Sequence, residues 1–126
     1  MIHVSLCSIF VDDQQKALDF YTKKIGFQKK VDEPIGEHRW ITVGQVDEGF
    51  ELVLEPDAHP AAKSYKEAIY KDGIPTTMFY VDDIEAEYNN LKEKNVKFKS
   101  PPATMGKVKV AVFDDTCGNF IMLCEK

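Results

Sequence analysis

Residues 5–30, SLCSIFVDDQQKALDFYTKKIGFQKK, contain the pattern that decides the fold. An apolar run ends at Val11, and Asp12 and Asp13 follow it directly. An aspartate at this place can accept hydrogen bonds from the free N–H groups of a first helical turn. Apolar side chains then recur at helical spacing as far as Gly26, a residue type that ends helices in a left-handed conformation. The stretch therefore predicts a strand, a helix and a second strand.

The same pattern occurs again at residues 76–100, TTMFYVDDIEAEYNNLKEKNVKFKS. The Val-Asp-Asp triplet recurs at 81–83, an offset of 70 residues, and the second helix is predicted to end near Asn95. Two further strands joined by a turn follow each copy, at 39–55 and at 107–125. We expect the order β-α-β-β-β, twice, in a protein of the α+β class.

Residues 55–75, EPDAHPAAKSYKEAIYKDGIP, separate the two copies. Pro60 suits the first turn of a helix, and Gly73 ends it. Its spacing predicts a buried side made of Ala61, Ala62, Tyr65, Ala68 and Ile69. Neither half is large enough to make a good core by itself, so we expect a single domain. The expected boundaries are 1–126 for the domain, about 1–56 for the first unit, about 57–74 for the linker helix and about 75–126 for the second unit.

The composition is that of a soluble, globular chain, with 44% hydrophobic and 29% charged residues. A net charge of −5 without a basic cluster argues against a nucleic-acid partner. No apolar stretch approaches the roughly 20 residues that span a bilayer, and no basic lead-in marks a secretory signal. Three cysteines without metal-site spacing suit a reducing compartment, so we expect a cytoplasmic protein. Cys7 and Cys124 are predicted to be buried, and Cys117 to be more exposed.

Two stretches, VDDQQKALDFYTKKIGF at 11–27 and VFDDTCGNFIML at 112–123, resemble the vicinal oxygen chelate superfamily. This superfamily includes glyoxalase I, bleomycin-resistance proteins and extradiol dioxygenases, and the resemblance covers nearly the whole chain. It implies the glyoxalase/bleomycin-resistance/dihydroxybiphenyl dioxygenase fold, in which two tandem βαβββ units form cup-shaped mixed sheets around a cavity. In the metalloenzymes of the superfamily, four strands each give one His, Gln or Glu to a divalent metal that acts as a Lewis acid.

The resemblance places the four ligand positions at Leu6, Val53, Thr76 and Met122. None of these supplies the imidazole or carboxylate that such a cation prefers. A shifted register does not restore the site, because His3 faces the other way from Leu6 and Glu55 is a lone carboxylate. We therefore expect no metal and no other cofactor.

The strand faces that hold these positions should point into the cup and line a small-molecule site. Trp40, the only tryptophan, is either an aromatic wall of that site or an ordinary core residue, beside an exposed pair, His38 and Arg39. No catalytic residue is predicted. The predicted ligand-binding residues are Leu6, Ser8, Phe10, Trp40, Val53, Glu55, Thr76, Met78, Tyr80 and Met122.

Three functions stay open at this point. A metal-free binding protein, similar in principle to the bleomycin-resistance members, would hold an unidentified small organic molecule in a cavity or dimer groove. The resemblance then implies a homodimer. An enzyme of the glyoxalase, epimerase or dioxygenase type would need another stabiliser for its anion, for which Glu55, Tyr80 and Arg39 are the candidates. An interaction module would have a cup filled by its own side chains. We expect the first, without a nucleic-acid or membrane partner.

Overall fold

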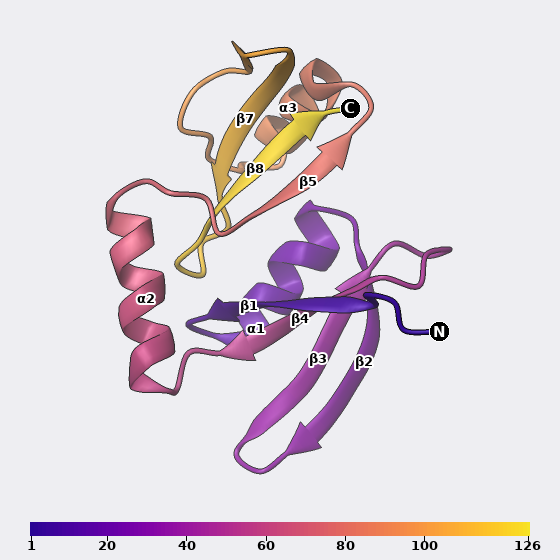
Figure 1. Ribbon diagram of the computed structural model, residues 1–126, viewed down its shortest axis with the longest axis vertical. Coiled ribbons are helices and arrows are strands. Elements are labelled where there is room, and N and C mark those ends of the chain that lie inside the picture. Colours follow the sequence, from indigo (N-terminus) through magenta and orange to yellow (C-terminus); the bar gives the residue numbers. More distant parts are fainter. The chain divides into compact units, whose positions relative to one another are not determined.

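The computed structural model describes residues 1–126, which form two βαβββ units. The first contains β1 (Leu6–Val11), α1 (Gln14–Asp19), the π-helical turn η1 (Phe20–Lys24), β2 (Gln28–Ile35), β3 (His38–Gly44) and β4 (Glu51–Pro56). The second follows α2 (Pro60–Lys71) and contains β5 (Thr77–Val81), α3 (Ile84–Glu93), β6 (Ala103–Met105), β7 (Val108–Asp114) and β8 (Phe120–Glu125). The predicted element order and the α+β class are confirmed (Figure 1). The short strand expected in the second copy before residue 100 lies instead at 103–105, and only Phe98 forms an isolated bridge, to Phe113.

Each unit has its own four-stranded mixed sheet. Sheet A has the strand order β1-β4-β3-β2, and sheet B has the order β5-β8-β7-β6. In both, the first and last strands of the unit pair in parallel, whereas the other neighbours are antiparallel. Ser8 lies opposite Val53 in sheet A, and Met78 lies opposite Met122 in sheet B. The sequence repeat is therefore also a repeat of register.

The two Val-Asp-Asp triplets start their helices in the same way. The Asp13 carboxylate accepts a hydrogen bond from the Lys16 N–H at 3.0 Å, and the Asp83 carboxylate accepts one from the Ala86 N–H at 3.1 Å. Both capping residues have extended backbone, as an N-cap requires. The predicted caps are thus confirmed at both helix starts.

The helices also end where the sequence predicted. Gly26 (φ 92°) and Asn95 (φ 65°) both adopt the left-handed conformation after the last turn. The first helix changes from α to π geometry at Phe20, where Phe20 and Tyr21 are buried in edge-to-face contact, with ring centroids 5.2 Å apart.

None of the helices combines the length and the apolar run that crossing a membrane would require.

A helix covers one face of each sheet, α1 on sheet A and α3 on sheet B (Figure 1). The core of the first unit contains Ile9, Val11, Leu18, Tyr21, Ile41, Val43, Leu52 and Leu54. That of the second contains Ile84, Leu91, Val96, Ala111, Phe113, Ile121 and Leu123. Successive strand residues point to opposite faces, so the residues between these strand positions face away from the helix. We call this side the front face of each sheet.

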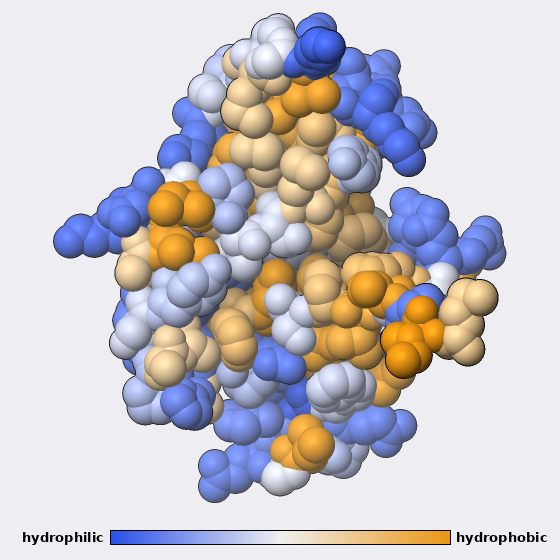
Figure 2. Space-filling model, viewed as in Figure 1, coloured by the Kyte–Doolittle hydropathy of each residue, from blue (hydrophilic) through white to orange (hydrophobic).

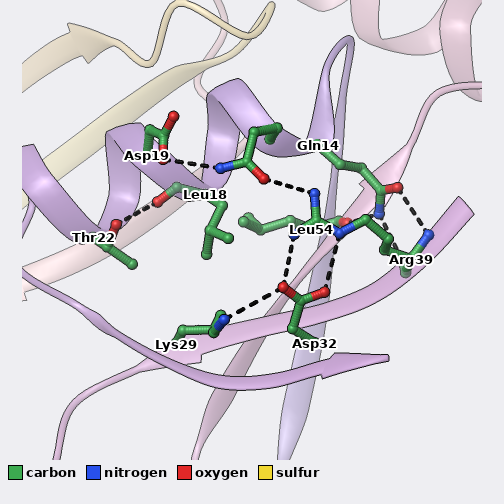
Figure 3. A network of polar contacts seen from close by, with 9 residues as sticks. Gln14, Leu18, Asp19, Thr22, Lys29, Asp32, Arg39 and Leu54 are labelled. Carbon is green, nitrogen blue, oxygen red and sulfur yellow. Dashed lines mark hydrogen bonds and ion pairs between the residues drawn. The ribbon is translucent and has the colours of Figure 1, made fainter. Parts of the chain in front are cut away.

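Gln14 joins α1 to sheet A (Figure 3). Its Nε2 donates to the Arg39 carbonyl at 2.6 Å and to the Leu54 carbonyl at 2.8 Å, and its Oε1 accepts from the Arg39 N–H at 3.1 Å. The Arg39 guanidinium binds both carboxylate oxygens of Asp32, at 3.0 and 2.7 Å. This contact lowers the pKa of the Asp32 carboxyl. The prediction of Arg39 as an exposed residue was wrong, because this carboxylate holds it half-buried on the helix side.

α2 begins at Pro60 as predicted, but it buries a different side. Ala61, Tyr65 and Ala68 are exposed, whereas Ala62 and Ile69 are half-buried. Lys66 is the buried residue of this helix, and its ammonium donates to the Cys117 carbonyl at 3.5 Å. The predicted buried side was wrong, because the aliphatic part of the Lys66 side chain packs this helix against the β7–β8 turn. The boundary between two compact units, Met1–Ser64 and Tyr65–Lys126, falls inside α2.

The last turn of α2 is attached to the second unit through Tyr70. Its hydroxyl donates to the Asp114 carboxylate at 2.5 Å, and its ring stacks on Phe120 with centroids 4.4 Å apart. The ammonium of Lys99 lies 4.8 Å from the other ring, that of Phe120, and donates to the Gly73 carbonyl at 3.3 Å. The hydrogen bond to a carboxylate raises the pKa of Tyr70 to about 12.

We expect Tyr70→Phe to lower the free energy of unfolding by about 1 kcal/mol near neutral pH, the usual contribution of one hydrogen bond. Because the folded-state pKa lies above the unfolded value of about 10, the bond contributes fully below about pH 10 and is lost as the pH rises through about 12. Urea denaturation of both proteins at about pH 8 and about pH 11.5 measures this. Tyr65→Phe, an exposed position on the same helix, is the control. A cost of Tyr70→Phe that stays constant with pH would contradict the assignment.

Candidate functional site

The front face of sheet A gathers residues from all four strands of the first unit. It carries Leu6, Ser8 and Phe10 from β1, Glu51, Val53 and Glu55 from β4, Trp40 and Thr42 from β3, and Val31 and Glu33 from β2. All of the site residues predicted for the first unit lie on this face. Their common face follows from strand alternation, which the sequence also shows.

An exposed tryptophan marks this face. Trp40 is 37% exposed and Leu6 is 41% exposed, whereas Val53 and Thr42 are both only 1% exposed. Phe10 is half-buried. Of the two interpretations of Trp40, that of an ordinary core residue is therefore wrong. The face presents aromatic and aliphatic surface around a buried centre, a composition common in ligand sites.

Three carboxylates share the front face with Trp40. The Ser8 hydroxyl donates to Glu55 at 3.2 Å, and the Thr42 hydroxyl donates to Glu51. Glu33 lies directly opposite Trp40 in the pairing of β2 with β3. None of these three glutamates forms an ion pair, whereas Asp12, Asp19 and Asp32 do. The negative charge on this face therefore has no cationic partner within the chain.

The front face of sheet B is mainly apolar and rich in methionine. Met78 (44% exposed), Tyr80 (62% exposed) and the half-buried Met122 lie on it, as predicted from the repeat. Met105, from β6, adds a third methionine and is 54% exposed. Figure 2 shows apolar side chains at the surface over β5 and β8, and also beside the N-terminal end of β1. Unbranched methionine side chains adapt to ligands of different shape.

Thr76 differs from the other predicted residues of the second unit. It precedes β5, and its hydroxyl donates to the Asn119 side-chain carbonyl at 3.0 Å. Its N–H donates to the Phe120 carbonyl at 2.8 Å. Thr76 therefore helps to fix the start of β8, and its hydroxyl keeps two lone pairs that could accept hydrogen bonds from a ligand.

Sequence reasoning missed Glu33 and Thr42 as members of the front face. Thr42 lies two residues after Trp40, so the period of a strand places both on one side. Glu33 could have been found from the hairpin at Gly36, because a short turn there puts it opposite Trp40. Tyr80 and Glu55 were grouped with Arg39 as candidate stabilisers of an anion. Arg39 instead lies on the helix side of sheet A, away from Glu55.

Two cysteines also lie elsewhere than predicted. Cys7 is exposed, because β1 is the edge strand of sheet A, and desolvation raises the pKa of its thiol. Cys117 is fully buried, since the turn that carries it packs under Lys66. Cys124 is buried as predicted. A thiol with a raised pKa carries less thiolate, so Cys7 has no enhanced nucleophilicity.

The donor set at the four expected ligand positions does not fit a divalent metal. Leu6 and Val53 lie on the front face of sheet A, and Met122 lies at the equivalent register in sheet B. Thr76, the fourth, offers a hydroxyl already engaged with Asn119. Across residues 1–126, no three His, Cys, Asp or Glu side chains come together in a way that could hold a metal ion. A hard divalent cation needs several oxygen or imidazole ligands, and these four positions supply no carboxylate and no imidazole.

The family model of the Glyoxalase/Bleomycin resistance protein/Dioxygenase superfamily matches residues 2–123. The chain belongs to this superfamily. Among its members, the uncharacterized protein YurT of Bacillus subtilis (strain 168) is 55% identical over 125 residues, 98% of each chain. This assignment confirms the resemblance seen at 11–27 and 112–123.

Two solved structures resemble this protein over almost the whole chain. UcmS2 has a TM-score of 0.86 and 33% identity, over 100% of this chain and 99% of its own. TnmS3, an antibiotic binding protein from Streptomyces sp. CB03234, has a TM-score of 0.80 and 29% identity, over 99% and 96%. At least one protein of similar structure is therefore an antibiotic binding protein.

Proposed function

We propose that this protein binds a small organic molecule without a metal ion. The observation that carries the proposal is that Leu, Val, Thr and Met occupy the four ligand positions, while aromatic and thioether side chains are exposed on the front faces around them. Small-molecule sites are lined mostly by such side chains, with a few polar groups that fix orientation. The similarity to TnmS3, an antibiotic binding protein, supports the same kind of activity.

Each front face offers its own set of groups for binding. Sheet A offers Leu6, Phe10 and Trp40 for apolar contact, around the buried Val53, and Ser8 and Glu55 for hydrogen bonds. Sheet B offers Met78, Tyr80 and Met122, with Thr76 at its edge. On this proposal, the rigid aromatic ring on the face of sheet A selects among ligands by shape, whereas the methionines on the face of sheet B adapt to ligands of different shape.

A ligand screen by native mass spectrometry tests the function, since the mass of the complex reveals a bound molecule of any chemical class. For a molecule found in this way, we expect Trp40→Leu to weaken binding about tenfold or more, because exposed tryptophans are frequent binding hot spots. Tyr65→Leu replaces an aromatic residue on α2 that is even more exposed, at 56% against 37%, and should leave the affinity unchanged. The proposal fails if the screen finds no bound molecule, or if Trp40→Leu and Tyr65→Leu behave alike.

We further propose that the protein is a cytoplasmic homodimer. The three cysteines form no disulfide and Cys7 is exposed, which suits a reducing compartment. The exposed apolar residues of the N-terminal segment, Ile2 and Val4, support contact with a second chain. Light scattering after size exclusion should give about twice the chain mass of 14.3 kDa. A mass equal to a single chain would rule the dimer out.

A further inference from the structure

We infer that the ligand is a planar organic cation, and that the front face of sheet A recognises both its ring and its charge. This inference rests on the binding function proposed above and names the class of molecule bound there. It depends on the contrast between the two faces of sheet A, on the surroundings of Trp40 and on the distribution of charge.

The first step is the difference in charge pairing between the two faces of one sheet. On the helix side, Asp32 is paired with Arg39 at 2.7 Å and with Lys29 at 3.5 Å. On the front face, Glu33, Glu51 and Glu55 form no ion pair. Like charges without partners on one sheet face oppose folding, and a bound cation would remove that cost.

The second step concerns Trp40. Its indole forms no ring contact and no cation–π contact within the chain, whereas Tyr80 on sheet B already has the Lys126 ammonium at 5.6 Å. Its neighbour across the β2–β3 pairing is the exposed carboxylate Glu33. An exposed indole next to a carboxylate suits a cationic ring, which gains a cation–π contact and an ion pair together.

The third step is that two of the carboxylates are held by the sheet itself. Ser8 donates to one oxygen of Glu55, and Thr42, which is almost fully buried, donates to one oxygen of Glu51. An ionised carboxylate accepts several hydrogen bonds, so each keeps capacity for a donor on the ligand. Carboxylates that are oriented before binding lose less side-chain entropy when the ligand arrives.

The fourth step is the charge distribution along the chain. Residues 1–64 hold 11 acidic and 7 basic side chains, a net charge of −4, whereas residues 65–126 hold 10 acidic and 9 basic ones, a net charge of −1. The Lys30 side chain lies beside Gly44 at the end of this face and donates to the Glu48 carbonyl, and His38, two residues before Trp40 on β3, forms no ion pair. On sheet B, the front-face carboxylate Asp114 accepts from Tyr70. Sheet A therefore carries the surface that attracts cations and repels anions.

Isothermal titration calorimetry with three flat ring systems of similar size tests this inference. They are 9-aminoacridine as the cation, acridine as the neutral molecule at about pH 8, and 9-anthracenecarboxylate as the anion. We expect 9-aminoacridine to bind at least about tenfold more tightly than acridine, and the anion to bind most weakly. The double variant Glu33→Gln/Glu55→Gln should lose about tenfold in affinity for 9-aminoacridine and none for acridine. At high salt, the difference in affinity between 9-aminoacridine and acridine should become smaller, because salt screens interactions between charges.

The matched control is Glu85→Gln/Glu87→Gln, which makes the same change of net charge at exposed positions of α3. This variant should bind all three molecules as the wild type does, and circular dichroism checks that each variant is folded. Equal binding of the three ring systems overturns the inference but leaves the proposed function in place. The inference is also overturned, and the proposed function kept, if the native screen finds a neutral or anionic ligand and 9-aminoacridine does not bind. If neither the screen nor the ring systems give binding, both proposals fail.

Discussion

Replacing Asp115 with alanine should lower the free energy of unfolding by about 3–5 kcal/mol, the usual cost of breaking a buried, hydrogen-bonded charge network. The carboxylate is fully buried in the turn before β8. One oxygen accepts from the Cys117 N–H at 2.7 Å and from the Asn119 N–H at 3.0 Å, and the other accepts from the Asn119 amide at 2.9 Å. Alanine leaves all three donors without this acceptor in a place that water does not reach.

Urea denaturation followed by circular dichroism measures this effect. Asp82→Ala is the matched control, because Asp82 is exposed and the neighbouring Asp83 provides the helix cap. Its cost should stay within about 0.5 kcal/mol. Asp115→Asn keeps the shape and one carbonyl acceptor, so it should cost less than alanine. A loss below about 1 kcal/mol for Asp115→Ala would show that this turn is held mainly by packing.

The order of elements was predictable because its signals are local. Each Val-Asp-Asp triplet fixes a strand end and a helix cap within a few residues, and the aspartates cap in the way the spacing indicated. The buried side of α2 was not predictable in this way. Its alanines make an apolar stripe, yet Lys66 is the residue buried, since the turn around Cys117 lies 51 positions away in sequence. The pattern of residue types within a helix does not show which part of the protein the helix will pack against.

The candidate site was predictable to the extent that strand period alone determines it. Trp40, Val53 and Glu55 fall on the expected face because alternation within a strand needs no partner. Glu33 was missed because its position opposite Trp40 depends on the register of the β2–β3 hairpin. The three glutamates become a common feature only when β2, β3 and β4 lie side by side. The proposal of a cationic ligand therefore depends on how these strands pair, which the sequence does not show directly.

Gln14→Ala should lower the free energy of unfolding by about 2–4 kcal/mol, because it removes the partner of three backbone groups in the first unit. The amide holds the Arg39 carbonyl, the Arg39 N–H and the Leu54 carbonyl, all within 3.1 Å (Figure 3). Gln15→Ala, its neighbour on the outer side of α1, is the control and should cost about 0.5 kcal/mol. Urea denaturation of both variants measures the difference.

The sequence repeat explains why this amide is needed in one unit only. At the offset of 70, the residue equivalent to Gln14 is Ile84, which is fully buried. In sheet B, the antiparallel ladder of β7 and β8 runs through five pairs, from Val110–Cys124 to Asp114–Phe120. In sheet A, the ladder of β3 and β4 has only two, Thr42–Val53 and Val43–Leu52.

The Gln14 amide therefore takes the place of ladder hydrogen bonds where β3 and β4 no longer pair, and it does so from the helix. Gln14→Leu separates this role from packing, since leucine restores the apolar volume that Ile84 provides in the second unit. We expect Gln14→Leu to remain at least about 2 kcal/mol less stable than the wild type, because the three backbone groups still lack a partner. Recovery of wild-type stability would mean that the space between α1 and sheet A needs filling, and that β3 and β4 tolerate an unpaired stretch.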